Sequence, residues 1–304
     1  MSTSQLMKVF ITGICGLLGQ KLAQTLSSDI YDVEGCDLYP QTIIPETPHR
    51  YYHLDIRDRE GTVTVITQSR PNAIIHTAAM TDVDSCERNR EACWKSNVVA
   101  TENILKSAEK VGARLIFIST DYIFNGKSGP YTEKDTPDPI NYYGRSKLAA
   151  ENLIRGSRVD WTILRTIVLY GYAKNARASF ITWLLKELRQ GHKVRIVNDQ
   201  WGNTTIADDL AKAIDRVLLL GKSGIYHIGG RGYQTRYQFA LTAAQVFGLD
   251  PNLISPITTA ELNQPAPRPL RSGLVVDKAE TELFITFHTP EEALQIYKSQ
   301  EKEK

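Results

Sequence analysis

The sequence predicts an α/β fold in which a doubly wound parallel sheet is joined to a smaller C-terminal α/β domain. Short runs rich in β-branched residues alternate with helical patterns from residue 8 to about residue 166, which is typical of βαβ units with helices on both faces of a sheet. A glycine-rich stretch, TGICGLLG, lies where the first strand meets the first helix. Beyond residue 166 the alternation loosens, and 256–273 is rich in proline with little periodicity. These features predict a Rossmann-type domain followed by a substrate domain.

The elements of the first part follow one another in regular order. Short apolar runs indicate strands, and longer runs with apolar residues every three or four positions indicate helices. The predicted strands are 8–12, 31–36, 72–79, 114–120 and 160–166, and the predicted helices are 16–28 and about 91–111.

The second part contains helical patterns at 179–191 and 235–248, separated by loops. A further helical pattern at about 205–220 is expected to return to the first domain, so the boundary is predicted to be discontinuous. We therefore assign 1–166 and 203–228 to a dinucleotide-binding domain, 167–202 and 229–298 to a substrate-binding domain, and 299–304 to a solvated polar tail.

Composition excludes several classes of function. The 304 residues contain 36 Lys plus Arg against 34 Asp plus Glu, without a block of either sign, so we expect no binding to nucleic acid or to an anionic membrane. The four cysteines, at 15, 36, 86 and 93, lack a C-x-x-C spacing, which predicts reduced thiols and no metal site. No apolar run approaches the length of a membrane span, and we expect a cytoplasmic protein.

The first motif predicts a dinucleotide site. Gly13, Gly16 and Gly19 follow a G-x-x-G-x-x-G spacing, with Leu17 and Leu18 at the helix start. Glycines there permit a tight turn and let the backbone approach a pyrophosphate, whose charge is stabilised by the N-terminus of the helix. The alternative is a plain strand-to-helix turn that happens to use glycine.

Asp37 stands at the end of the second predicted strand, where an acidic residue would hold a ribose of the dinucleotide. A carboxylate at that position repels a 2′-phosphate, so Asp37 favours NADH over NADPH. Arg50 or another nearby base could relieve that repulsion.

The stretch YYGRSK, 142–147, predicts an acid–base pair. A helix turns roughly 100° per residue, so Tyr143 and Lys147 share a helix face and Tyr142 does not. A phenol has a pKa of about 10, and a nearby lysine cation would lower that pKa. Tyr143 is then the proton donor, and Thr120 ends the preceding strand at the edge where ligands bind. The alternative is a core tyrosine beside a solvated lysine.

These motifs resemble the extended short-chain dehydrogenase/reductase superfamily. Four longer stretches resemble the dTDP-4-dehydrorhamnose reductase family: STDYIFNGKSGPYTEKDTPDPINYYGRSKLAAE, VNDQWGNTT, GIYHIGG and RPLRSGL. The resemblance spans nearly the whole chain and implies that Thr120, Tyr143 and Lys147 are catalytic. Thr120 and Tyr143 would bracket a substrate carbonyl oxygen, Tyr143 would protonate the alkoxide formed by hydride transfer, and Lys147 would also hold the nicotinamide ribose.

The resemblance assigns further residues to ligands. Asp55 and Ile56 would contact the adenine end of the cofactor, and Ala78, Ala79 and Thr81 would line it. Asp121 would face the substrate beside Thr120. Arg268 is a candidate clamp for the substrate diphosphate, because a planar guanidinium suits phosphate; the alternative is a surface arginine in a loop.

This sequence departs from the family pattern at two positions of the substrate region. Val168 replaces a tryptophan that packs against the sugar in family members, and Thr204 stands where proline is common. Trp201 could supply an aromatic surface instead, or it could be a core or lid residue. Nucleotide-sugar 4,6-dehydratases, which are relatives by fold, have an Asp–Glu pair after the active-site threonine, because elimination needs its own acid and base. Here Tyr122 follows Asp121, which disfavours sugar dehydration.

We therefore expect an NAD(P)H-dependent reductase of a nucleotide-diphosphate-linked 4-keto-6-deoxy sugar. The alternatives are a regulatory NAD(P)-binding subunit, resembling that of methionine adenosyltransferase, and a nucleotide-sugar epimerase. The expected ligands are NAD(P)H and a nucleotide sugar. By analogy with the resembling enzymes, we expect a homodimer without a metal ion.

Overall fold

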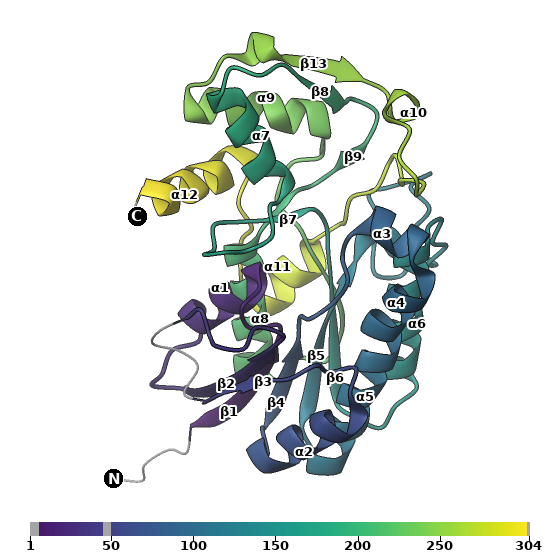
Figure 1. Cartoon of the computed structure of the whole chain (residues 1–304), viewed down its shortest axis with the longest axis vertical. Coiled ribbons are helices and arrows are strands. Elements are labelled where there is room, and N and C mark those ends of the chain that lie inside the picture. The colour runs from purple at the N-terminus through teal and green to yellow at the C-terminus, as the bar shows by residue number, and fades with distance from the viewer. Residues whose placement is uncertain (1–5, 45–49, 303–304) are drawn as a thin grey trace.

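The computed structural model describes residues 6–44 and 50–302. Its main sheet has seven parallel strands in the order β11-β6-β5-β4-β1-β2-β3, shown in Figure 1. These strands are β1 (Met7–Thr12), β2 (Tyr31–Asp37), β3 (Arg50–His53), β4 (Ala73–His76), β5 (Arg114–Thr120), β6 (Trp161–Thr166) and β11 (Gly224–Ile228). The predicted doubly wound α/β fold is confirmed.

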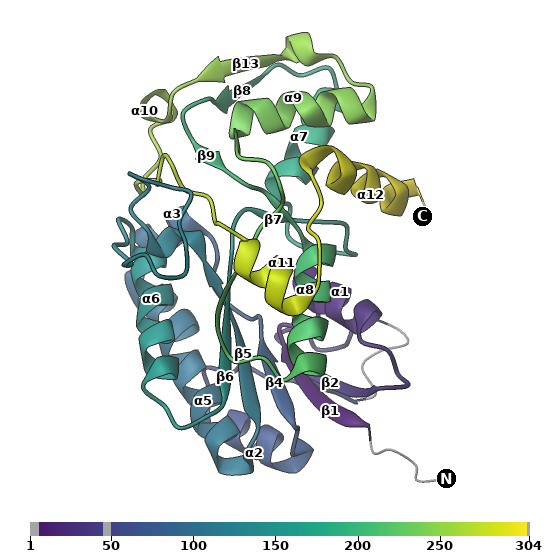
Figure 2. The ribbon, with the colours of Figure 1, turned by 180° about the vertical axis from the view of Figure 1, so that it is seen from behind.

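Helices cover both faces of this sheet. The helices are α1 (Leu17–Thr25), α8 (Ala207–Leu220) and α11 (Asp277–Leu283) on one face and α2 (Arg59–Ser69), α5 (Ala100–Val111) and α6 (Tyr142–Arg155) on the other. Successive strand residues point to opposite faces, and Val9 packs with Leu22 of α1 while Phe10 packs with Ile104 of α5. Each helix therefore buries its apolar stripe on its own side of the sheet, and Figures 1 and 2 show the helices on the two faces.

The register aligns the carboxyl ends of the strands at one edge of the sheet. Thr12 lies level with Cys36 and with His76, and Thr120 lies level with Thr166. The strand order reverses between β1 and β4. In open α/β sheets, ligands bind at the carboxyl edge beside such a reversal.

A second lobe sits above that edge in Figure 1. It is built on the parallel pair β8 (Val194–Val197) and β13 (Ile254–Ile257) and on α7 (Phe180–Arg189), α9 (Arg236–Phe247) and α12 (Pro290–Lys302). Its core contains Leu184, Phe239 and Leu294.

Short elements complete the chain. They are β7 (Leu169–Tyr170), β9 (Trp201–Gly202), β10 (Thr205–Ile206), β12 (Gln234–Thr235), α3 (Val83–Arg88), α4 (Arg90–Trp94) and α10 (Thr259–Leu262). A π-helical turn, Lys95–Val99, joins α4 to α5 inside the helix predicted at about 91–111. Within the described residues, no helix is long and apolar enough to cross a membrane.

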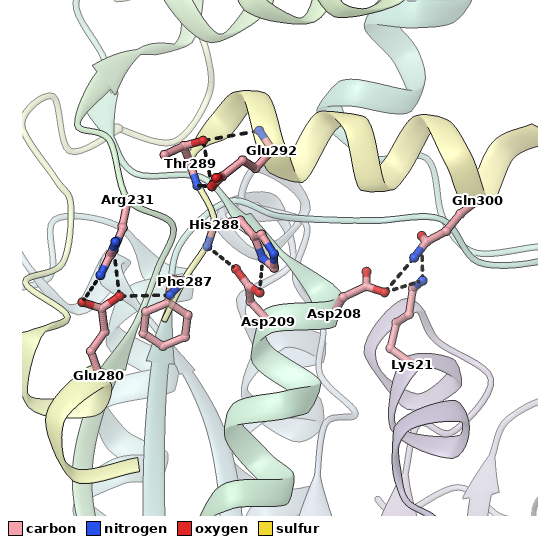
Figure 3. A network of polar contacts seen from close by, with 10 residues as sticks. All are labelled: Lys21, Asp208, Asp209, Arg231, Glu280, Phe287, His288, Thr289, Glu292 and Gln300. Carbon is pink, nitrogen blue, oxygen red and sulfur yellow. Dashed lines mark hydrogen bonds and ion pairs between the residues drawn. The ribbon is translucent and has the colours of Figure 1, made fainter. Parts of the chain in front are cut away.

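The C-terminal helix is tied to two helices that cover one face of the sheet, as Figure 3 shows. Gln300 of α12 accepts a hydrogen bond from Lys21 of α1 at 2.8 Å and donates one to Asp208 of α8 at 2.8 Å. Residues 299–302 of the predicted polar tail thus continue α12, and residues 303–304 of that tail lie outside the described residues. The exact domain boundaries stay a prediction.

Candidate active site

A cavity of about 820 Å³ opens between the carboxyl edge of the sheet and the second lobe. Its wall is formed by the turns that follow β1, β2, β4 and β5, by the start of α6, and by the loop 175–179 before α7. Of the residues predicted to form the site, all but Gly19, Trp201 and Arg268 line this cavity.

The glycine turn after β1 brings backbone segments closer together than side chains would allow. Gly13 has a φ of 71°, and a Cβ there would lie 3.0 Å from the backbone of Ala78. The first amide groups of a helix have no intrahelical acceptor. At α1 the N-cap residue is Gly16, so no side chain caps these amide groups. Gly19 acts differently, because a Cβ there would lie 2.5 Å from the Ile14 backbone. The third glycine therefore lets α1 pack against the turn.

Asp37 lies at the end of β2 beside this turn. Its carboxylate accepts hydrogen bonds from the Cys15 amide at 3.0 Å and the Leu38 amide at 2.7 Å. Asp37 lines the cavity, whereas Arg50 lies outside the cavity wall, where its guanidinium approaches Tyr52 Oη at 3.5 Å. Arg50 therefore does not offset the charge of Asp37 by direct contact.

Two further segments complete the end of the cavity expected to hold the cofactor. Asp55 lies beside Ile56 and accepts from Arg57 Nε at 2.9 Å, and this hydrogen bond lowers the pKa of the Asp55 carboxyl. Ala78, Ala79 and Thr81 line the cavity after β4.

Asn97 holds the loop after β4, and the sequence analysis missed it. Its side chain accepts from the Met80 amide at 2.8 Å and donates to Ser146 of α6 at 3.0 Å. The π-helical turn carries Asn97, and such turns are frequent at functional sites. The sequence pattern is helical throughout this stretch, so it gave no signal of the turn.

The predicted catalytic residues come together in the cavity wall. Thr120 ends β5, and Tyr143 and Lys147 lie one turn apart on α6 with their side chains buried. Tyr142 is absent from that wall and lies 5.3 Å below the guanidinium of Arg90. The helix face predicted for Tyr143 and Lys147 is therefore the face toward the cavity.

Burial sets the protonation of these two groups. It raises the pKa of the Tyr143 phenol, while a hydrogen bond with Thr120 opposes the rise. Burial also lowers the pKa of Lys147 to about 7, against the attraction of Glu151. We expected a lowered phenol pKa, and the direction differs because removal from water penalises the charged form of each group. At neutral pH the phenol keeps its proton, which is the form that donates.

A buried ion pair between α6 and β6 holds the end of β5 in place. Glu151 of α6 pairs with Arg165 of β6 at 2.8 Å and accepts from Ser119 Oγ at 2.5 Å. The side chains of Glu151 and Arg165 are 0% and 2% exposed. This network fixes α6 against β5 and β6, and hence Tyr143 against Thr120.

Asp121 is buried directly beside Thr120. Its carboxylate accepts from Ser272 Oγ at 2.5 Å and from Thr120 Oγ1 at 3.2 Å, and burial raises its pKa to about 6. Ser272 belongs to the RPLRSGL stretch, so one contribution of that stretch is to hold Asp121. Val168 also lines the cavity, with a φ of 45° that is rare for a β-branched residue.

Two predicted substrate residues lie elsewhere. Trp201 stacks on Tyr233 with ring centroids 5.6 Å apart and lines a smaller chamber next to the cavity. Arg268 pairs with Asp84 at 2.9 Å, and its side chain is 8% exposed. Arg268 is therefore neither in the cavity wall nor an exposed loop arginine.

Arg236 is a cavity residue that the sequence analysis missed. It is the first residue of α9 and lines both the cavity and the smaller chamber. Its place depends on how the second lobe folds over the sheet, so the local pattern TRYQFA gave no signal. Among the described residues, no cluster of three or more His, Cys, Asp or Glu side chains could hold a metal ion, and all four cysteines are buried free thiols.

The sequence of this chain is similar to those of known proteins. The family model described as RmlD substrate binding domain matches residues 7–302. The probable low-salt glycan biosynthesis reductase Agl14 of Haloferax volcanii is 33% identical over 291 residues, which cover 95% of this chain and 96% of the relative. Methionine adenosyltransferase 2 subunit beta of Xenopus tropicalis is 31% identical over 280 residues, which cover 90% of this chain and 81% of the relative.

A solved structure is also similar. The dTDP-4-dehydrorhamnose reductase of Bacillus anthracis, in complex with NADP, superposes with a TM-score of 0.88 at 29% sequence identity. The match covers 97% of this chain and 100% of that chain. The likeness therefore includes both the sheet and the second lobe.

Proposed function

Because this chain belongs to the family of the RmlD substrate binding domain, we propose that it is an NAD(P)H-dependent reductase. Its substrate is a 4-keto-6-deoxy sugar carried on a nucleoside diphosphate. The observation that carries this proposal is the convergence of Thr120, Tyr143 and Lys147 on one cavity with the glycine turn and Asp37.

The residues present suit a nicotinamide dinucleotide. A Cβ at Gly13 or Gly16 would narrow the space beside the backbone of the glycine turn. The start of α1 offers uncapped amide groups to a pyrophosphate. Asp37 would hold the adenosine ribose, and Lys147 would hold the nicotinamide ribose. When bound, NAD(P)H supplies the hydride that reduces the sugar carbonyl.

The chain itself supplies the proton and orients the carbonyl. Tyr143 donates a hydrogen bond to the carbonyl oxygen, where negative charge develops. The single hydroxyl proton of Thr120, which points to Asp121 in the substrate-free protein, turns to the same oxygen when the substrate binds. Tyr143, protonated at neutral pH because burial raises its pKa, transfers its proton to the new alkoxide. Asp121, fixed by Ser272, orients Thr120.

The test is oxidation of NADPH and of NADH in the presence of dTDP-4-keto-6-deoxy-L-mannose, followed at the nicotinamide absorbance. We expect turnover with at least one cofactor. Bound cofactor without turnover of this or a related carbonyl substrate would favour a regulatory subunit like the methionine adenosyltransferase relative. Interconversion of 4-epimers without net cofactor oxidation would favour an epimerase.

Asp37 is proposed to set the cofactor preference. Its carboxylate lines the cavity beside the glycine turn and accepts hydrogen bonds from two backbone amides, so its charge repels a 2′-phosphate. Asp37→Ala should therefore shift the ratio of kcat/KM values toward NADPH. Equal ratios in the wild type and the variant would contradict this role, and Asp32→Ala at the other end of β2 is the control.

We further propose a cytoplasmic homodimer, by analogy with resembling enzymes. Sedimentation of the purified protein over a range of concentrations tests the dimer. A monomer at all concentrations would contradict it.

A further inference from the structure

The small chamber next to the cavity, here called the side chamber, is lined by both polar and apolar residues. It measures about 20 Å³, room for about one water molecule or one oxygen-bearing group. It shares Asp121, Tyr122, Val168 and Arg236 with the wall of the main cavity. A ligand in the substrate end of the cavity would therefore reach the side chamber beside Arg236.

Arg236 differs from the other arginines near the cavity in lacking a carboxylate partner. Arg57 pairs with Asp55, Arg177 with Asp82, and Arg268 with Asp84. Within the described part of the chain, no ion pair joins Arg236 to a carboxylate, and the buried carboxylate of Asp121 attracts it only at longer range. Its guanidinium lies 5.3 Å from the Phe180 ring centroid and contacts the Tyr122 phenol.

Gln234 adds a second donor in the same wall. Its Nε2 atom is buried and has no hydrogen-bond partner among the described residues, and the side chain lines the side chamber. Gln234 forms β12 with Thr235, immediately before Arg236 starts α9. A buried donor without an acceptor costs about 1–3 kcal/mol, so an oxygen acceptor here would be stabilising.

We propose that Arg236, with Gln234 as a second donor, binds the diphosphate of the nucleotide-sugar substrate. This inference rests on the proposed function, whose substrate carries its negative charge on that diphosphate. A guanidinium presents several donors in a plane that matches phosphate oxygens, and the Phe180 ring supports this plane. The role expected for Arg268 passes to Arg236, because Arg268 is already paired with Asp84.

The test is calorimetric titration of the NADP⁺-saturated protein with dTDP and with UDP, comparing wild type with Arg236→Met. A hydrogen bond to a charged group contributes about 1.5–3 kcal/mol, so we expect the Kd of the better nucleotide to rise by about 10- to 100-fold. Arg236→Lys keeps the charge without the planar fork and should give a smaller loss. Gln234→Leu should weaken binding less than Arg236→Met.

Arg195→Met is the matched control, because Arg195 lies in the same lobe with a side chain 63% exposed. It should leave nucleotide affinity unchanged, and unchanged NADP⁺ affinity in every variant would show that the fold is intact. Arg236→Met with wild-type affinity for both nucleotides would overturn the inference, even if the wild type reduces the sugar. A specific loss of dTDP or UDP binding would support it even if no sugar tested is reduced.

Discussion

Tyr142 and Tyr143 are neighbours in sequence but have different surroundings. Tyr143 is 9% exposed and packs with Cys86 and Cys93 at the cavity wall. Tyr142 lies on the outer side of α6 under the Arg90 guanidinium. One residue of helical rotation thus separates the proposed proton donor from a half-buried aromatic residue outside the cavity wall.

This pair gives a matched mutational test. Tyr143→Phe removes the proton donor and should lower kcat by about two to four orders of magnitude, while NADP⁺ affinity stays near that of the wild type. Tyr142→Phe should change kcat by less than about threefold, because only a hydroxyl outside the cavity wall is lost and the ring still packs beside Arg90. Steady-state kinetics and NADP⁺ titration check both, and the reverse ranking would show that the wrong tyrosine was assigned.

Lys147 should make stability depend on pH. Its pKa in the folded, cofactor-free protein is about 7, below its ordinary value of 10.5. Between these two values the unfolded chain binds more protons than the folded chain, so this group makes stability rise as pH rises. The free energy of unfolding of wild type relative to Lys147→Met should therefore increase from pH 7 to pH 9. A pH-independent difference in urea unfolding would contradict the lowered pKa.

At the scale of elements, the sequence predicted the helices and strands whose apolar pattern lies within their own residues. Each of these elements has a pattern of apolar residues in its own sequence that matches the burial of its side chains. They are β1, β2, β4, β5, β6 and α1. The glycine turn, Asp37 and the pair on α6 were predictable for the same reason. Arg236 and Ser272 were not, because they reach the site only through the packing of the second lobe against β5.

The contact between α1 and the turn after β1 depends on Gly19. A Cβ there would lie 2.5 Å from backbone atoms of Gly13 and Ile14. Because backbone atoms yield less than a flexible side chain, Gly19→Ala should cost about 1–3 kcal/mol of unfolding free energy and weaken NADP⁺ binding. Gly156→Ala is the control, because its Cβ would have ordinary contacts, the nearest at 3.4 Å. Similar urea midpoints for the two variants would contradict this account.

At the scale of the whole molecule, polar contacts join the two lobes (Figure 3). Asp209 of α8 accepts from the backbone amide of His288 at 3.0 Å, just before α12 begins. Beside it, Lys21 of α1 contacts both Asp208 and Gln300. The apolar periodicity of the helices could not predict this junction, because its residues are far apart in sequence.

Lys21 allows the strength of this junction to be measured. The Lys21 side chain is 4% exposed, and Lys21→Met would leave Asp208 and Gln300 without their shared donor. We expect a loss of about 1–3 kcal/mol as a lower urea midpoint at unchanged slope. Lys106→Met on the surface of α5 should change stability by less than about 0.5 kcal/mol. Equal midpoints for the two variants would show that the junction contributes little.

The path of the chain between the lobes constrains how such enzymes can exchange parts. After β6 the chain enters the second lobe, returns to the sheet with α8 and β11, leaves with α9, returns with α11 and leaves again with α12. A chimera that combines this sheet with the second lobe of a relative therefore needs a junction at each of these crossings. A single recombination event would instead join incomplete parts of both lobes. In this architecture, a new substrate specificity is therefore reached more easily by point changes in the cavity wall, such as at Val168, than by exchange of a whole lobe.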